Sequence, residues 1–476
     1  MRGWIADGRG VAVIGAWLAI GGCSDPVVSI SGDGLSPAQR ASGQVSEECA
    51  VVEQQLRCWF LEPHEGDQQL LMLRDELEPA LPLPAVPLGT SAPVRGFDTA
   101  LTSRSRCAAL GGEGVKCWGY NEGHTTADFD DYQLGRPEVD IVVGDEADER
   151  GTGLPFVALG ATDVVSVTQS QYGYCALFES GGVKCWGSGN PTSGLGDLET
   201  RGDEPDEMGD ALPFVDLGTD VHAVGLVGMF THVCVWTDDG RVKCWGHNDL
   251  SQLGTPPSEP IGDEPGEMGD AQPFVDLGPD FVVVQVTAGS NYSCALSDDG
   301  RVKCWGANAT PHVPGAPNDE EGSPTNYGRL GQGDRRESMP ATGDALPPVD
   351  LGGTDAKVVG IAAGSTHTCA LFDHGRVKCW GSGGGGKLGY GSTDNIGDEP
   401  GEMGDALPFV DLGDHVAVKL GCTQSRSCVL TDEPSVLCWG PLGTDDGLYR
   451  PGATPGTMGD ALIPMATPEE LGVAGP

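Results

Sequence analysis

A short unit that contains two cysteines recurs along the chain and constrains the fold more than any other feature. In its clearest copy, the apolar segments 367–372 and 376–381 alternate like β-strands on either side of Asp373-His374-Gly375. A three-residue loop that ends in Gly is a common hairpin connection, because Gly accepts the left-handed backbone at the bulge. Cys369 and Cys379 then face each other across an antiparallel pair, within the separation that a disulfide needs. The register therefore predicts a disulfide within one hairpin.

Seven copies of this unit are present, and the second cysteine of each copy is followed by Trp. The predicted disulfide pairs are Cys49/Cys58, Cys107/Cys117, Cys175/Cys185, Cys234/Cys244, Cys294/Cys304, Cys369/Cys379 and Cys428/Cys438. Six pairs enclose nine residues, which fits the three-residue loop, and the first encloses eight, which needs a two-residue turn near Glu53-Gln54. The first copy also lacks the turn Gly, and the seventh has Pro434 in its place.

Further strand-like segments lie upstream of each hairpin, for example residues 358–364 and 408–413. Each repeat would then contribute four short strands. Four-stranded sheets repeated radially leave few free edges, and seven repeats lie within the usual range of blades. We therefore predict an all-β fold, a seven-bladed β-propeller of four-stranded antiparallel blades. A solenoid is the alternative, but it needs atypical polar caps at both ends, whereas the termini here resemble pieces of one blade.

The ends of the chain suggest how the ring closes. A Pro-Phe-Val-Asp-Leu segment or a variant of it precedes six hairpins but not the first, while residues 459–465 repeat this phrase after the seventh hairpin. We predict that residues 462–466 pair into the blade that holds Cys49 and Cys58. The C-terminal strand would then join the first blade and bury a sheet edge.

The repeated unit resembles the repeat of the regulator-of-chromosome-condensation (RCC1) family. The shared pattern is a strand of small residues, a His-Thr/Ser-x-Ala-Leu strand, a Gly turn, a strand that ends in Trp-Gly, and a downstream Gln-Leu-Gly element. In this chain that last element occurs at residues 132–135, 251–254, 328–331 and 387–389. The resemblance covers about residue 41 to the C-terminus and implies the propeller fold. It does not imply one function, because the family includes exchange factors, chromatin binders, secreted inhibitors and enzyme-bound modules.

Residues 1–22 have the pattern of an export signal. Arg2 and Arg9 precede about ten apolar residues, too few to cross a hydrocarbon core of ~30 Å. The segment ends in Ile-Gly-Gly-Cys, which resembles a bacterial lipobox in which Cys23 becomes the lipidated first residue of the mature protein. An ordinary signal peptide with a chance cysteine is the alternative. By the sorting habit of such lipoproteins, Ser24 indicates the outer membrane or cell surface of a two-membrane bacterium.

The residues after Cys23 are rich in Ser, Gly, Asp and Pro, which is typical of a flexible tether. The predicted organisation is a lipoprotein signal peptide at residues 1–22, a lipidated tether at residues 23–40 and a single propeller at residues 41–476. The lipid would be the only attachment to a membrane, and we expect a monomer.

The cysteines favour an oxidising compartment. Of the 16 cysteines, fourteen fall into regular pairs, Cys23 has its lipid role, and Cys422 is left over. Zinc binding is the alternative use of paired cysteines, but structural zinc sites favour two to four residues between ligands, so we predict no metal site. Cys422 aligns with Ala363, Ala288 and Gly228 in other copies, and we expect a buried small thiol there.

The net charge of −43 excludes several classes of partner. With 27 basic residues against 70 acidic ones, the chain cannot present the positive field that nucleic acid binding requires. The repeated acidic loops, such as residues 262–270, lack the alternating Asp-x-Asp-x-Asp-Gly spacing of a calcium loop. Solvated acidic loops are the simpler interpretation, although calcium binding stays open.

Catalytic motifs are not found in the sequence: there is no Gly-x-Ser-x-Gly elbow, His-Glu-x-x-His pair or phosphate loop. His232 and His367 occupy the same repeat position, where the fifth copy has Tyr292. A side chain repeated at a fixed position indicates packing or hydrogen bonding between blades. We therefore predict no catalytic residue and no cofactor.

Two connections, residues 120–153 and 307–345, are longer than the others, and long loops of this kind often carry recognition. We expect a surface binding scaffold for a protein or glycan partner. The alternative is an enzyme or enzyme-associated domain that acts on a cell-wall or extracellular polymer at the mouth of the propeller channel. Paired acids with perturbed pKa values in a pocket there would favour that alternative.

Overall fold

The computed structural model describes residues 49–52, 55–58, 86, 88–97, 105–121, 134–136, 142–143, 151–170, 173–204, 206–309, 328–353, 356–433, 435–441 and 450–465. The predicted signal peptide, Cys23 and the tether lie outside these residues. Within them, no helix is long and apolar enough to cross a membrane.

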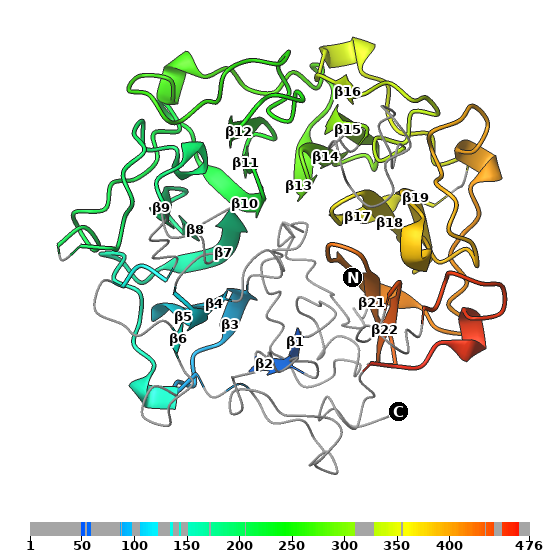
Figure 1. The fold of residues 1–476 in the computed structure, drawn as a ribbon, viewed down its shortest axis with the longest axis horizontal. Helices are drawn as coiled ribbons and strands as arrows, with labels where there is room; N and C mark the ends of the chain where they lie inside the picture. The colour runs from blue at the N-terminus through cyan, green and yellow to red at the C-terminus, as the bar shows by residue number, and fades with distance from the viewer. Residues whose placement is uncertain are drawn as a thin grey trace, which may run out of the picture.

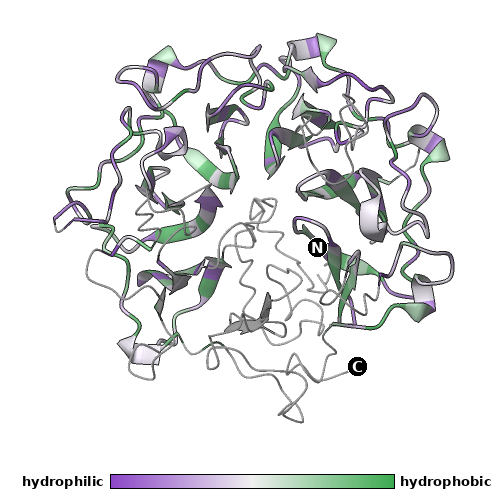
Figure 2. Cartoon of the chain, in the orientation of Figure 1, coloured by the Kyte–Doolittle hydropathy of each residue, from purple (hydrophilic) through white to green (hydrophobic). Residues whose placement is uncertain are grey.

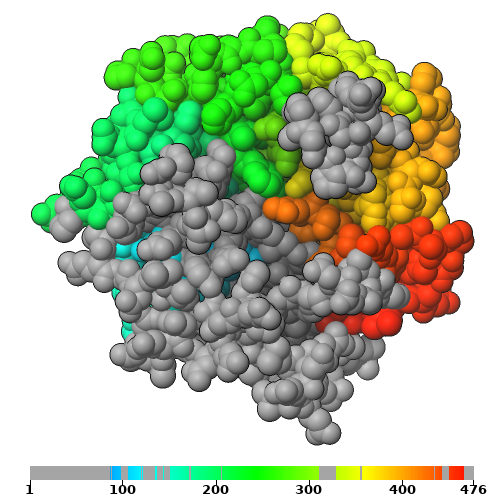
Figure 3. Space-filling model, in the orientation of Figure 1, coloured from blue at the N-terminus to red at the C-terminus, as the bar shows by residue number. Residues whose placement is uncertain are grey.

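The described chain consists of antiparallel β-sheets that follow one another in chain order around a central axis (Figure 1). Figure 3 shows the same succession of chain segments, from green to red, around the molecule. The strands are β1 (Cys49–Val52), β2 (Gln55–Cys58), β3 (Val94–Phe97), β4 (Ser105–Leu110), β5 (Gly114–Tyr120), β6 (Val142–Val143), β7 (Val164–Ser170), β8 (Gly173–Phe178), β9 (Val183–Gly187), β10 (Ala223–Met229), β11 (His232–Thr237), β12 (Val242–Gly246), β13 (Val283–Gly289), β14 (Tyr292–Ser297), β15 (Val302–Ala307), β16 (Ser338–Met339), β17 (Val358–Ala363), β18 (His367–Phe372), β19 (Val377–Gly381), β20 (Ala417–Cys422), β21 (Ser427–Thr431) and β22 (Val436–Trp439). Short 3-10 turns lie at Gly151–Gly153, Pro191–Ser193, Gly269–Ala271, Gly343–Ala345, Gly384–Gly386, Gly404–Ala406 and Gly459–Ala461.

The register of the hairpins is the predicted one. Cys369 pairs with Cys379 across β18 and β19, and Gly375 in the connecting loop has the left-handed φ of +78° that the loop requires. The bridges described by the structure are Cys107–Cys117, Cys175–Cys185, Cys234–Cys244, Cys294–Cys304, Cys369–Cys379 and Cys428–Cys438. In the first copy, Cys49 lies opposite Cys58 in the backbone register, and the side chains there lie outside the described part.

The prediction of seven four-stranded blades is right only in part. Four sheets have three strands, two have four, and the first copy is described only as the hairpin of β1 and β2. The inner strands, such as β13 and β17, are the small-residue segments and lie nearest the axis in Figure 1. The fourth strands, β6 and β16, come from the connections that follow β5 and β15.

The Pro-Phe-Val-Asp-Leu segments run along the outer edge of the sheets. They do not form the regular strands that the sequence predicts. Val410 donates its N–H to Val377 O at 2.8 Å. Pro408 has no N–H to continue this pairing, which is why a ladder does not extend along the segment. Alternate side chains are nevertheless buried, among them Val410 and Leu412.

These outer segments border the hairpin before them and not the hairpin after them. The hydrogen bonds run from Val215 N to Val183 O, Val275 N to Val242 O, Val349 N to Val302 O, and Val410 N to Val377 O. Met465 N donates to Val436 O in the same way, at 2.8 Å. The prediction that the C-terminal segment joins the blade of Cys49 and Cys58 is therefore wrong for its described part. Met465 lies on the sheet of the seventh copy, because the open edge of β22 is the nearest acceptor along the chain.

The core lies between neighbouring sheets, and the strands carry most of the hydrophobic residues while many loop residues at the rim are hydrophilic (Figure 2). The Trp after the second cysteine is buried in this core in the third to seventh copies. Trp380 is fully buried and donates from Nε1 to Arg329 O of the preceding copy at 3.1 Å. A Cβ at Gly331 would come within 2.9 Å of this indole. The Gln-Leu-Gly element therefore needs its Gly to pack against the Trp of the next sheet.

Candidate functional site

A buried lysine, at the same position of the repeat in five copies, joins neighbouring sheets. In the fifth copy, Lys303 Nζ donates to Leu277 O at 2.8 Å and to Gly343 O at 3.0 Å. Leu277 belongs to the outer segment of the preceding sheet, so the ammonium group connects two sheets. The equivalent residues Lys116, Lys184, Lys243 and Lys378 make the same pair of contacts.

Burial lowers the pKa of all five of these lysines from the usual 10.5. Each ammonium group also lies over an aromatic ring; Lys378 Nζ, for example, is 4.9 Å from the centre of the Phe409 ring. This contact was not predicted from the sequence, although Val-Lys-Cys-Trp recurs in the five copies. Since their donors are used between sheets, these lysines have a structural role.

The two repeated histidines form hydrogen bonds between sheets, as predicted. His232 Nε2 lies 2.8 Å from Ser293 Oγ, and His367 Nε2 lies 2.9 Å from Ser427 Oγ. At the equivalent position, the Tyr292 hydroxyl donates to His367 O at 2.6 Å. Burial lowers the pKa of His232 to about 3 and that of His367 well below 6.5, so both rings are neutral at pH 7.

The acidic loops are closed by their own glutamate. Glu267 Oε2 accepts from Gly262 N at 2.9 Å and from Glu264 N at 3.1 Å. Glu207 and Glu402 accept equivalent backbone N–H groups. This contact gives the repeated Gly-Asp-Glu-Pro phrase a structural reason that needs no bound ion.

Two carboxyl groups in these loops have raised pKa values, but they repeat and do not mark one site. Burial raises the pKa of Asp203 and of Asp398, and the nearby carboxylates Glu207 and Glu402 raise them further. The two pairs occupy the same position in two copies of the loop. An active site is usually singular, so these pairs do not support the enzyme alternative.

An asparagine anchors the loop that follows the hairpin in three copies. Asn248 Oδ1 accepts the N–H of Leu253 at 3.1 Å, and this Leu belongs to the Gln-Leu-Gly element. The equivalent bonds join Asn121 to Leu134 at 2.9 Å and Asn308 to Leu330 at 3.1 Å. All three asparagines are buried. These asparagines were not predicted from the sequence, although Asn follows Trp by three residues in each case.

The same anchor therefore spans loops of very different length. The Asn and the Leu are 5 residues apart in the fourth copy, 13 in the second and 22 in the fifth. The two longer loops belong to the predicted recognition segments 120–153 and 307–345. Since β5, β12 and β15 are equivalent third strands, all three loops leave their sheets at the same end. The described anchors of the three loops therefore lie at equivalent ends of their sheets.

Part of the 307–345 connection is fixed to the body of the protein. Arg335 pairs with Asp398 at 3.0 Å and with Glu399 at 2.8 Å, and both acids lie in the acidic loop of the next copy. Met339 in β16 pairs with Gly306. These contacts fix the described C-terminal part of the connection to the ring.

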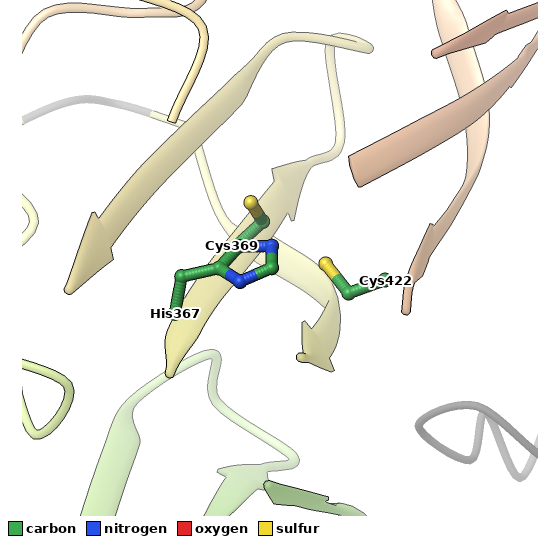
Figure 4. A group of neighbouring side chains, drawn as sticks. All are labelled: His367, Cys369 and Cys422. Atoms are coloured by element: carbon green, nitrogen blue, oxygen red, sulfur yellow. The ribbon is translucent and has the colours of Figure 1, made fainter. Parts of the chain in front are cut away.

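A histidine and two cysteines form a buried cluster between the sheets of the sixth and seventh copies (Figure 4). A ring nitrogen of His367 and the sulfur atoms of Cys369 and Cys422 all lie within 4.8 Å of one another. Because Cys369 is bridged to Cys379, only two of the three groups could act as metal ligands, fewer than a structural zinc site requires. Cys422 is 1% exposed and belongs to none of the six bridges, which confirms the predicted buried thiol.

The Regulator of chromosome condensation (RCC1) repeat family matches residues 283–309 and 358–386. The human E3 ubiquitin-protein ligase HERC2 is 28% identical over 244 residues, which cover 49% of this chain and 4% of HERC2. Protein pim1 of Schizosaccharomyces pombe is 27% identical over 362 residues, which cover 70% of this chain and 57% of pim1. The chain thus spans little more than half of pim1 and a small part of HERC2.

Similar solved structures include human WBSCR16, with 18% identity, a TM-score of 0.48 and coverage of 73% of this chain and 79% of that chain. Yeast RCC1 (Prp20), solved bound to Kap60, has 18% identity and a TM-score of 0.36, with coverage of 72% and 81%. The matched repeats, the sequence relatives and the antiparallel sheets around one axis support a relationship of this chain to the RCC1 repeat family.

Proposed function

We propose that this protein is an exported, lipid-anchored scaffold whose ring presents loops on one face to a protein or glycan partner. The observation that carries the proposal is the common asparagine anchor beneath loops of three lengths. A fixed base with a variable tip is the arrangement by which rigid frames usually carry recognition. Lengthening a loop between fixed ends costs little free energy, because the closure entropy grows only slowly with length.

The distribution of charge supports a partner with a basic surface. The chain has 27 basic residues, and five of its lysines are buried between sheets. The exposed surface is therefore even more acidic than the composition suggests. Exposed carboxylates of the loops include Glu199, Asp206 and Glu264. Attraction between opposite charges would speed association, and the rate should fall as salt is added.

The export and anchoring part of the proposal rests on the N-terminal sequence and on the disulfides. The six bridges support an oxidising compartment. The lipobox at Cys23 supports attachment by lipid, and residues 23–40 have the composition of a flexible tether.

The loop proposal can be tested by trimming the two long loops just inside their anchors. Residues 122–133 or residues 310–327 are replaced by four Gly/Ser residues, close to the length of the short loop between Asn248 and Leu253. A chain in which residues 249–252 are replaced by four Gly/Ser residues is the matched control. Melting curves show whether each variant keeps its fold.

Partners are captured from detergent-solubilised envelopes with the full chain, identified, purified and bound again to each variant. We expect at least one trimmed variant to lose binding at least tenfold, while the 249–252 control keeps it. Equal binding by both trimmed variants would contradict recognition by these loops. Release of soluble fragments from a purified cell-wall polymer by the full chain would favour the enzyme alternative.

A further inference from the structure

We propose that Cys422 exchanges with the Cys369–Cys379 bridge, so that the disulfide moves from within one hairpin to a Cys369–Cys422 link between two sheets. The inference is independent of the proposed binding function. It identifies Cys422 as a site of thiol–disulfide exchange inside the ring. It rests on four buried side chains from the sixth and seventh copies.

The first observation is the proximity of a thiol to a disulfide. Figure 4 shows the Cys422 sulfur directed from β20 toward His367 and Cys369 of β18, and the two sulfurs lie within 4.8 Å of each other. The Ser427 hydroxyl contacts both, at 3.4 Å from Cys369 Sγ and 3.7 Å from Cys422 Sγ. Only a small movement of Cys422 would bring its sulfur into contact with the bridge.

The second observation explains why the attack is directed at Cys369. Cys422 pairs in register with Ser427, and Cys428 is the next residue along β21. Successive side chains of a strand point to opposite faces, so Cys428 and its bridge lie on the other face of that sheet. Cys369 lies on the facing sheet of the sixth copy. The reachable disulfide is therefore the one between Cys369 and Cys379.

The exchange is balanced in atoms and electrons. The thiolate of Cys422 attacks Cys369 Sγ, the bond between Cys369 Sγ and Cys379 Sγ breaks as the new S–S bond forms, and Cys379 leaves as a thiolate. The proton given up by Cys422 ends on Cys379. One disulfide and one thiol are present before and after, so no external oxidant or reductant is needed.

His367 is placed to carry the proton. Its Nε2 lies 2.9 Å from Ser427 Oγ, and its Nδ1 makes no hydrogen bond to the described residues. Burial, aided by the charge of Lys387, lowers the pKa of this ring well below 6.5, and a contact with the Arg426 carbonyl opposes the shift. The neutral imidazole can accept a proton only transiently. Exchange should accordingly be slow, on the order of minutes to hours.

The fourth and fifth copies provide a natural comparison within the same chain. There His232 Nε2 lies 2.8 Å from Ser293 Oγ, and Cys234 Sγ lies 3.8 Å from the same hydroxyl. Ala288 pairs with Ser293 as Cys422 pairs with Ser427. The two sites differ chiefly by one sulfur atom. Exchange is therefore expected between the sixth and seventh copies, where Cys422 is present, and not between the fourth and fifth copies, where Ala288 takes its place.

The test determines which cysteine carries the thiol before and after incubation. The purified, fully folded chain is incubated without oxygen at pH 7, 8 and 9, quenched in acid, denatured and alkylated, and its peptides are mapped without reduction. We expect the alkyl label to move from Cys422 to Cys379 while a Cys369–Cys422 peptide appears and the number of thiols stays constant. The rate should rise with pH, because the thiolate is the nucleophile.

Three variants control the experiment. Cys422→Ala, which copies Ala288, should leave Cys379 unlabelled. Ala288→Cys should allow the same exchange with the Cys234–Cys244 bridge and release Cys244. His367→Gln should slow the exchange at least tenfold without changing its products.

Two results would overturn the proposal. One is a label that stays on Cys422 after two days at pH 9 in folded protein. The other is labelling of Cys379 at the same rate in the Cys422→Ala variant, since the thiol would then arise without exchange. If Ala288→Cys does not fold, the comparison of the natural chain with Cys422→Ala still shows whether labelling of Cys379 depends on Cys422.

Discussion

Replacing the buried lysine of one sheet by methionine should destabilise the ring by about 2–4 kcal/mol. In Lys303→Met the stem keeps its packing, but the bonds from Nζ to Leu277 O at 2.8 Å and to Gly343 O at 3.0 Å are lost. A hydrogen bond that involves a charged group contributes about 1.5–3 kcal/mol, and a buried carbonyl without a partner costs about 1–3 kcal/mol. Removing a buried ammonium group offsets part of this loss, because its desolvation costs several kcal/mol.

Urea denaturation followed by tryptophan fluorescence would measure the effect as a shift of the midpoint at unchanged slope. Lys357→Met is the control, because Lys357 is exposed and its Nζ donates to the carbonyl of Asp298 at the surface. Lys243→Met should behave like Lys303→Met, since its Nζ makes the equivalent contacts. A midpoint for Lys303→Met that equals the control would refute the idea that the ammonium groups hold neighbouring sheets together.

Three further predictions concern pH, the C-terminal segment and the anchor. Burial lowers the pKa of His232 to about 3 in the folded chain, whereas an unfolded His titrates near 6.5, so the unfolded state binds more protons between these values. The contribution of His232 to the free energy of unfolding should be fully present above pH 6.5 and should fall by about 1.4 kcal/mol per pH unit below it. Urea curves of His232→Gln should lack this pH dependence. Deleting residues 458–476 should lower the urea midpoint, because the buried Leu462 and the bond from Met465 to the seventh sheet are lost; an unchanged midpoint would contradict this role. Cys23→Ala should shift the protein to the soluble fraction in cell fractionation, and retention on membranes after a high-salt wash would argue against the lipid.

The hairpins could be predicted because their information is local. The loop that ends in Gly375 sets the register, and the register places Cys369 opposite Cys379. The repeated His position could likewise be assigned to contacts between sheets, because repetition itself argues against a single active site. For the candidate loops, length alone identified residues 120–153 and 307–345. The asparagine anchors beneath them were missed, although a fixed distance from Trp could have identified them.

By itself, the sequence determined the repeat, the hairpin register, the pairing of cysteines within hairpins and the acidic charge, since each depends on neighbours in the chain or on composition. Only the tertiary structure decided which sheet receives each outer segment. Because the repeats are nearly identical, pairing with the preceding or the following hairpin is equally compatible with the sequence. Contacts between copies, such as Lys303 with Leu277 or Cys422 with Cys369, arise only when the ring brings distant segments together.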